Sequence, residues 1–362
     1  MTVQRLIAIY ILICTAIIIY SIFTIPYFRG INRPDSFYKR RFYSRLMSEF
    51  HKDHISITYK YFLMLKLVRL KYVSAFDEFL KIQCKEDRNA TEKYMRNISS
   101  LLVSVTLSAI QKNPVLAAFF PYLIYKNGFY RENTPGNVIH MLRRLLSEKD
   151  YYIRENAVTA VFSFRKPALV EQAALILNES DSFIPANFLQ DLRDFKGNKE
   201  EMYNRLLSVH SSFMPAMQKT IIDSVRESDI DYRKEIFDIF RIPGINEAVA
   251  ASCLQYFEAH KYEKALLVIV SYASSLDTKH IELASAASAT LGMYPCRLTT
   301  QILFNNLSNK NGYIAYNSVV SLLKQGFTYI DFTKYIDGPD KGLSNMILQC
   351  LSAEDNNYKR GN

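Results

Sequence analysis

The sequence predicts an all-α protein in which a hydrophobic N-terminal helix precedes a stacked array of helical hairpins. Glycine is scarce, with 11 residues in 362, and this disfavours sheet-rich folds with many tight turns. Apolar residues make up 49% of the chain, which is ample material for a core. Beyond residue 136, apolar positions recur at helical spacing in segments that repeat every 30 to 35 residues. A repeat of this length is typical of stacked helical hairpins.

Residues 1–28 are expected to form one transmembrane anchor. The 20 residues from Leu6 to Ile25 carry no charge, and as a helix they would extend about 30 Å, the thickness of the hydrocarbon core of a bilayer. The apolar core of a secretory signal peptide is shorter, and no small-residue cleavage site follows Ile25. We therefore expect a retained membrane helix that ends near Pro26.

Basic residues after this segment predict both its orientation and a lipid-binding cluster. Only Arg5 and the amino terminus precede the segment, whereas six basic residues follow it with Asp35 as the sole acidic residue among them. This membrane-surface basic cluster consists of Arg29, Arg33, Lys39, Arg40, Arg41 and Arg45. Because basic residues close to a span resist translocation, we expect the N-terminus outside and the body of the chain in the cytoplasm. The cluster is expected to attract anionic lipid headgroups.

The net charge of +10 lies near the expected anchor. Residues 1–150 carry 23 Lys and Arg against 11 Asp and Glu, whereas residues 151–362 carry 22 against 24. This placement favours a membrane surface over nucleic acid as the anionic partner. The alternative is that the surplus positive charge serves only to keep the protein soluble. The five cysteines are widely spaced and odd in number, which indicates a reducing compartment.

Residues 29–132 are expected to form a basic juxtamembrane block of long helices with an irregular pattern. The segment Ile57–Ile82 is apolar nearly all round, with Lys60, Lys66, Arg69 and Lys71 set into it. It is predicted to be a core helix whose lysines extend to the surface. The alternative is a helix that lies against the bilayer or a membrane partner by its apolar face. Glycines and a proline within residues 126–137 mark the end of the block.

Six segments of residues 137–351 align as the second helices of hairpins. Their apolar anchors are Ile153, Ile184, Met214, Val249, Ile281 and Ile314. A residue that favours the start of a helix stands three positions before each anchor: Asp150, Asp181, Ser211, Asn246, Thr278 and Asn311. One hairpin cannot bury its apolar side alone, so a stack with a continuous core is predicted. Residues 352–362 are expected to be a polar tail.

The segment Glu148–Phe164 resembles the second helix of a HEAT repeat. It has an acidic cap, then Arg154, then Ala157 and Ala160 at close-packing positions. The segment Asp277–Gly292 is similar in its run of small residues but lacks the arginine. The resemblance covers about residues 137–351, and its motifs are loose. It implies a right-handed α-solenoid of about six to seven hairpins with a concave protein-binding surface, and it transfers no catalytic residues.

No catalytic residue, metal site or cofactor is predicted, because no Walker, zinc-ligand or nucleophile motif occurs in the sequence. We expect a non-enzymatic, membrane-anchored scaffold or adaptor whose cytoplasmic solenoid binds proteins. The expected partner is an integral membrane enzyme or transporter with its cytosolic subunits, as in a bacterial envelope or polysaccharide assembly. Neither nucleic acid nor a small-molecule substrate is expected. The alternatives are a HEAT-like enzyme and a solenoid that binds nucleic acid or anionic lipid.

Partner contacts are expected on the exposed rim of the second helices. Arg154, Asn187 and Asn317 occupy positions there that are predicted to point into solvent.

Overall fold

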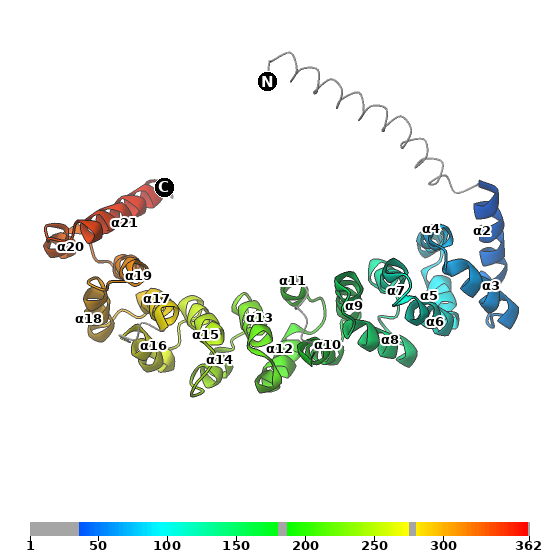
Figure 1. Ribbon diagram of the computed structural model, residues 1–362, viewed down its shortest axis with the longest axis horizontal. Coiled ribbons are helices and arrows are strands. Elements are labelled where there is room, and N and C mark those ends of the chain that lie inside the picture. The colour runs from blue at the N-terminus through cyan, green and yellow to red at the C-terminus, as the bar shows by residue number, and fades with distance from the viewer. Residues whose placement is uncertain (1–35, 180–186, 275–279, 361–362) are drawn as a thin grey trace, which may run out of the picture. The chain divides into compact units, whose positions relative to one another are not determined.

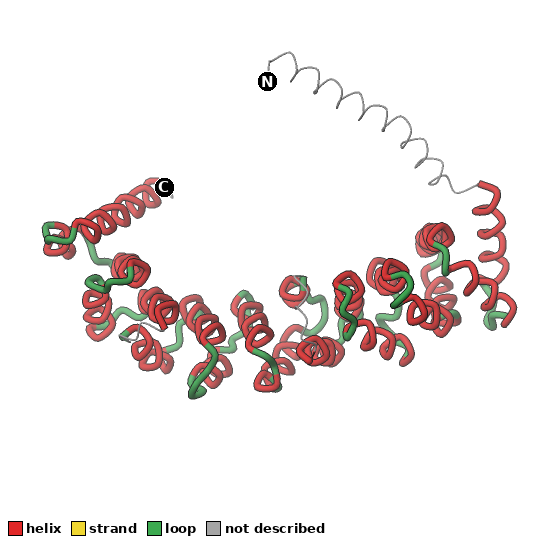
Figure 2. The backbone as a smooth tube through the Cα atoms, in the orientation of Figure 1, coloured by secondary structure: helices red, strands yellow, loops and turns green. Residues whose placement is uncertain are grey.

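The computed structural model describes residues 36–179, 187–274 and 280–360, and these residues form α-helices joined by short turns (Figure 1). No strand occurs in this part of the chain (Figure 2). The expected N-terminal anchor, residues 1–28, lies outside the described residues. Among the helices that are described, none has both the length and the apolar character needed to cross a membrane.

The helices group into two compact units that divide between Phe164 and Arg165. The N-terminal unit contains α2 (Ser36–Phe50), α3 (Ile57–Leu67), α4 (Leu70–Glu86), α5 (Arg88–Asn97), α6 (Ser99–Ala109), α7 (Pro114–Asn127), α8 (Gly136–Leu146) and α9 (Tyr151–Ser163). The C-terminal unit contains α10 (Pro167–Glu179), α11 (Phe188–Arg193), α12 (Lys199–Ser208), α13 (Pro215–Arg226), α14 (Arg233–Phe240), α15 (Glu247–Ala259), α16 (Leu266–Ala273), α17 (Ile281–Thr290), α18 (Arg297–Asn306), α19 (Gly312–Lys324), α20 (Tyr329–Ile336) and α21 (Lys341–Arg360).

The break that the sequence places at residues 132–137 falls inside the N-terminal unit. Helix α7 precedes this break and α9 follows it, yet the two pack closely against each other. Both helices bury an apolar face, with Phe120 and Ile124 on α7 and Ile153 and Ala157 on α9. Packing of these faces places the helices on both sides of the loop in one core.

The prediction of one long helix over Ile57–Ile82 is wrong. The segment forms α3 and α4, which are separated at Val68 and Arg69 because the backbone of Arg69 is extended there. Helix α3 buries Tyr59 and Leu63 on one side, and α4 buries Phe76 among others. A straight helix that is apolar all round would leave one side in water, whereas the break lets each half bury a different face.

The C-terminal unit consists of two layers of helices (Figure 1). Helices α11, α13, α15, α17 and α19 pack successively against one another and form one layer. The other layer holds the first helix of each hairpin, and α14, α16 and α18 each contact the second helix that follows. This succession of hairpins is consistent with the predicted helical repeat.

The buried positions of the second helices recur at nearly constant spacing. Equivalent residues that are at most 1% exposed are Ala157, Phe188, Ile221, Cys253, Ala287 and Ser318. Successive members of this set are 31 to 34 residues apart. The predicted anchors Ile153, Val249 and Ile314 are buried in the same register, so their prediction is confirmed.

Two predicted anchors are out of register. Met214 is 50% exposed, and Met217 takes its place in the core of α13. The reason is a short 3-10 turn at His210–Ser212, which delays the start of α13 to Pro215. Ile281 is only partly buried, and Leu283 replaces it. Ile184 lies outside the described residues.

Three of the predicted helix caps are confirmed. Asp150 accepts a hydrogen bond from the Ile153 backbone N–H at 3.0 Å, and Asn246 and Asn311 cap α15 and α19 in the same way. Ser211 lies within the 3-10 turn before α13 and is not its cap, so that prediction is wrong. Asp181 and Thr278 lie outside the described residues.

Hydrogen bonds join neighbouring repeats of the C-terminal unit and also the two helices of one hairpin. The Thr290 hydroxyl donates to the Leu254 carbonyl at 3.1 Å, and the Ser321 hydroxyl donates to the Ser288 carbonyl at 2.7 Å. The Tyr256 hydroxyl accepts the backbone N–H of Tyr232 at 3.1 Å. These bonds satisfy polar groups between buried surfaces, and each contributes about 1 kcal/mol.

Candidate functional site

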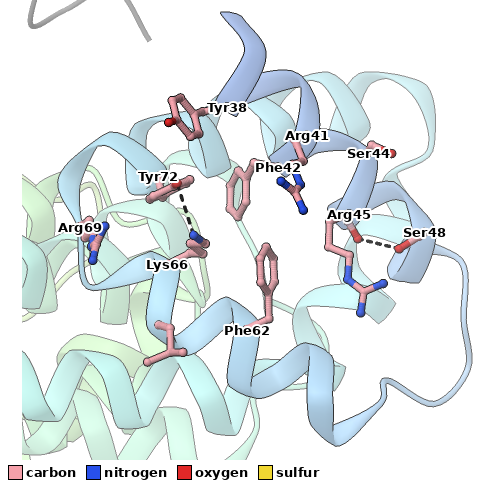
Figure 3. Close-up of a pocket in the computed structure, with 11 residues that line it drawn as sticks. Tyr38, Arg41, Phe42, Ser44, Arg45, Ser48, Phe62, Lys66, Arg69 and Tyr72 are labelled. Atoms are coloured by element: carbon pink, nitrogen blue, oxygen red, sulfur yellow. Dashed lines mark hydrogen bonds between the residues drawn. The ribbon is translucent and has the colours of Figure 1, made fainter. Parts of the chain in front are cut away.

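A pocket of about 900 Å³ lies between α2, α3 and the start of α4 in the N-terminal unit (Figure 3). We call it the α2–α4 pocket. It is lined by Tyr38, Arg41, Phe42, Ser44, Arg45, Ser48, Phe62, Leu65, Lys66, Arg69 and Tyr72. Four of these residues are cations, four are aromatic and none is acidic. Its volume is in the upper part of the range for small-molecule sites, which is roughly 300 to 1,000 Å³.

Helical spacing explains why these side chains share one pocket. On α2, Tyr38, Phe42 and Arg45 are separated by four and three residues and therefore lie on one face. On α3, Phe62 and Lys66 are separated by four residues and lie on the face that turns toward α2 (Figure 3). The break at Arg69 then folds the start of α4 back to complete the wall.

Aromatic rings form the inner wall of the α2–α4 pocket. Phe42 and Tyr72 are buried, and their rings meet edge to face with centroids 5.1 Å apart. The Phe62 ring faces Phe42 at 6.2 Å, as Figure 3 shows. Such ring pairs stabilise the wall beyond the area they bury. The wall therefore offers a fixed apolar surface to a ligand.

Lys66 is held at this wall by the aromatic rings. Its Nζ atom lies 4.9 Å from the centroid of Tyr72 and 5.8 Å from that of Phe62. The ammonium group also donates a hydrogen bond to the Tyr72 hydroxyl at 3.4 Å (Figure 3). Cation–π contacts of this kind contribute about 0.5–1 kcal/mol at exposed sites. Lys66 is thus positioned beside the pocket without a carboxylate partner there.

The neighbouring carboxylates are paired with cations outside the pocket. Glu49 accepts a hydrogen bond from Lys52 at 2.7 Å, and this bond is the main cause that lowers the pKa of Glu49. Glu78 forms an ion pair with Lys39. Within the described part of the chain, Arg41, Arg45 and Arg69 form no ion pair. The pocket therefore has a net positive charge, offset only in part by the attraction between Arg45 and Glu49, and this charge favours an anionic ligand.

An exposed apolar stripe on α3 adjoins the pocket. The stripe consists of Ile57, Tyr61, Leu65 and Val68, which follow one another at intervals of four, four and three residues. All four are exposed, and Ile57 reaches 85%. Leu65 also lines the pocket, so the α3 apolar stripe and the α2–α4 pocket form one continuous surface. Contiguous exposed apolar surface of this kind marks interaction sites.

The predicted basic cluster is only partly brought together. Arg41 and Arg45 line the pocket, whereas Arg40 is exposed and is not among its lining residues. Lys39 pairs with Glu78 on α4. Arg29 and Arg33 lie outside the described residues. The sequence pattern missed that Lys66 and Arg69, more than twenty positions away, join the cluster, because only the packing of α3 against α2 brings them there.

The expectation that Arg154 is exposed is wrong, because its side chain is 3% exposed in α9. The equivalent positions of later repeats hold the small residues Ala250, Ala284 and Ala315, all of them buried. This position therefore faces the core rather than the rim.

Asn317 and Asn187 differ in their surroundings. Asn317 is partly buried, and its amide donates to the Ser285 carbonyl at 3.1 Å and to the Ser285 hydroxyl at 2.9 Å. It therefore links α17 to α19. Asn187 is exposed at the beginning of α11, as predicted. Its role as a partner contact stays a prediction.

The layer of second helices exposes small side chains on α15 and α17 and two tyrosines on α19. Ala248 on α15 is exposed and Ser285 on α17 is partly exposed. On α19, Tyr313 is 76% exposed and Tyr316 about half exposed, three residues apart on one face. We call these residues the second-helix surface. Tyrosine is enriched at protein-binding surfaces.

Metal chemistry has no evident location in the described ranges, where no three His, Cys, Asp or Glu residues are grouped so that they could hold an ion. The α2–α4 pocket and the second-helix surface are therefore the two candidate sites. No protein-family model and no curated protein sequence matches this chain.

Proposed function

We propose that this protein is a membrane-anchored scaffold that binds partner proteins through its C-terminal helical repeat. In this proposal the repeat is a HEAT-like, right-handed α-solenoid, residues 1–28 are the anchor, and the body is cytoplasmic. The observation that carries the proposal is the continuous layer of second helices, from α11 to α19, which exposes the second-helix surface. Extended surfaces of stacked repeats bind proteins in many solenoids.

The chemistry of the second-helix surface supports a protein partner. Tyrosine provides a large apolar ring together with a hydroxyl that hydrogen-bonds, and it is enriched among residues that dominate binding energy. Small side chains such as Ala248 and Ser285 leave room for larger side chains of a partner. Across α13–α19, residues 215–324 carry 11 Lys and Arg and 11 Asp and Glu. This balance favours a protein over a polyanion as the ligand of this region.

The N-terminal sequence supports a location at the membrane. The uncharged stretch Leu6–Ile25 has the length of a membrane span. A membrane anchor raises the local concentration of the repeat around membrane proteins, so we propose an integral membrane enzyme or transporter with its cytosolic subunits as the partner. An assembly that builds the bacterial envelope or a polysaccharide is the setting we propose.

Affinity purification from detergent-solubilised native membranes tests this function. The tagged full-length protein is compared with the double variant Tyr313→Ala/Tyr316→Ala. The control is Tyr329→Ala/Leu267→Ala, which removes two exposed apolar side chains from first helices of the same unit. We expect a reproducible partner that the control retains and that the test variant recovers at about one tenth or less. Equal recovery by both variants, or no partner with the wild type, would contradict the proposal.

A further inference from the structure

We propose that the α2–α4 pocket binds the phosphate-bearing headgroup of an anionic phospholipid while the α3 apolar stripe contacts the acyl-chain region. This inference rests on the membrane location in the proposed function. It adds a defined site and two cations, Lys66 and Arg69, that lie outside the basic cluster predicted from the sequence. Its test does not depend on the capture of a protein partner.

The charge of the pocket selects an anion. Arg41, Arg45, Lys66 and Arg69 line it, and no carboxylate does. Guanidinium groups bind phosphate oxygens through two parallel hydrogen bonds, and a lysine adds a compact point charge. Because Lys66 is already held by the rings of Phe62 and Tyr72, it needs little reorganisation to meet a ligand.

The apolar part of the surface distinguishes a phospholipid from a free phosphate ion. A bare phosphate has no apolar part that could contact the wall of Phe42 and Phe62 or the exposed stripe that continues from Leu65 to Ile57. A phospholipid carries a polar headgroup and an apolar body that are covalently joined. It can therefore occupy the pocket and cover the stripe at the same time, in the manner of interfacial helices that combine basic and apolar faces.

The length of the preceding chain places the pocket within reach of a bilayer. Residues 26–35 separate the uncharged stretch from the start of α2 at Ser36. Ten residues span at most about 36 Å when fully extended. If Leu6–Ile25 crosses the membrane as proposed, α2 begins within this distance of the headgroups. The pocket is formed by α2 itself and the two helices that follow, so it is the part of the described chain that lies nearest to the stretch in sequence.

Calorimetric titration of the full-length protein in an uncharged detergent tests the site. The probes are short-chain phosphatidylglycerol, short-chain phosphatidylcholine with the same acyl chains, and inorganic phosphate. The test variant is Arg41→Gln/Arg69→Gln, which removes two charges from the pocket. The matched control is Lys81→Gln/Lys85→Gln, which removes two exposed charges from α4 outside the pocket. Circular dichroism checks that both variants retain the helical content of the wild type.

The expected result is saturable binding of phosphatidylglycerol by the wild type and little binding of phosphatidylcholine or phosphate. The test variant should bind phosphatidylglycerol about tenfold or more weakly, because each lost hydrogen bond between charged groups removes a large part of the binding free energy. The control should stay within about threefold of the wild type, because exposed charges act weakly through solvent.

Three outcomes would overturn the inference. Phosphate binding as tight as lipid binding would make the pocket a site for a free anion. Equal loss in the test and control variants would replace a defined site by diffuse attraction between charges. Unchanged lipid binding in a folded test variant would show that the lipid binds elsewhere.

Discussion

The first three described helices and the stack from α13 to α19 are both helical, but they differ in the charge and the apolar side chains that they expose. Residues 36–86 carry 11 Lys and Arg against 5 Asp and Glu, whereas residues 215–324 carry 11 of each. Eight large apolar side chains are exposed over residues 36–86, and six over the described part of the longer range 215–324. The difference supports the proposals that the first region meets an apolar and anionic surface and that the second contacts water and protein partners.

Neighbouring repeats explain how the stack avoids exposed apolar surface. Each second helix, such as α15, is covered on both sides by the helices before and after it, and hydroxyls such as that of Thr290 satisfy carbonyls between them. In α3 the stripe from Ile57 to Val68 has no such neighbour among the described residues. An apolar face is thus a structural element in the one region and a candidate binding surface in the other.

The largest effect is expected from a core substitution in the stack. Leu254 in α15 is fully buried, whereas Leu267 in α16 is 73% exposed. Leu254→Ala should lower the free energy of unfolding by about 2–5 kcal/mol, and Leu267→Ala should change it by less than about 0.5 kcal/mol. Denaturant unfolding of the full-length protein in detergent, followed by circular dichroism, measures both. Similar effects of the two variants would mean that α15 is not covered by its neighbouring helices at Leu254.

The second largest effect is expected at alkaline pH, which should destabilise the stack. Burial raises the pKa of Tyr232 and of Tyr256 to about 12 from the usual value of 10.0 for tyrosine. The folded state keeps these hydroxyls protonated after the unfolded chain has lost the protons, so their contribution to stability is constant below about pH 10 and falls as the pH rises from about 10 towards 12. Unfolding midpoints measured across this range check the trend. In the variant Tyr232→Phe/Tyr256→Phe the unfolding midpoint should fall less steeply with pH. An unchanged slope would contradict the assignment of the pH dependence to these two hydroxyls.

A smaller effect should follow from the loss of one hydroxyl within the α14–α15 hairpin. The Tyr256 hydroxyl accepts the Tyr232 backbone N–H at 3.1 Å. Tyr256→Phe leaves this buried N–H without its acceptor and should lower the free energy of unfolding by about 1–3 kcal/mol. Tyr316→Phe is the matched control, since the exposed side chain of Tyr316 is open to water. The same denaturant experiment compares them, and equal stability of the two variants would contradict the role of the bond.

The smallest effect should come from an ion pair at the surface of the stack. Lys324 on α19 contacts Glu258 on α15 at 2.8 Å, across two repeats, and both side chains are partly exposed. Glu258→Gln should lower the free energy of unfolding by less than about 1 kcal/mol, and the difference should shrink as salt is added. A larger, salt-independent effect would show that this pair fixes the spacing of the second helices.

The repeat could be predicted from the sequence because local signals determine it. Helix caps such as Asp150 and Asn311 act within one turn, and apolar spacing within a helix reveals which face is buried. The register of α13 could not be predicted, since a 3-10 turn before Pro215 displaces its start. The burial of Arg154 was missed for a related reason, because its neighbours in sequence do not show which helices cover it.

The α2–α4 pocket could be predicted only in part. Arg41 and Arg45 belong to a basic run that is visible in the sequence, and Lys66 and Arg69 interrupt an apolar one. The two groups meet because α3 ends at Leu67 and α4 folds back from Leu70. That break has no proline or glycine to signal it. Tertiary packing therefore decides the composition of the site.

Tryptophan fluorescence offers the most direct test that the two regions meet different surroundings. The chain contains no tryptophan, so Tyr61→Trp in the α3 apolar stripe and Tyr313→Trp on α19 each introduce a single reporter at an exposed tyrosine. The full-length variants are reconstituted in vesicles of phosphatidylglycerol and phosphatidylcholine whose acyl chains carry bromine, a contact quencher. We predict that bromine quenches the fluorescence of Trp at position 61 and leaves Trp at position 313 unchanged. Absence of quenching at position 61, or equal quenching at both positions, would contradict the division between a membrane-facing region and a water-exposed repeat.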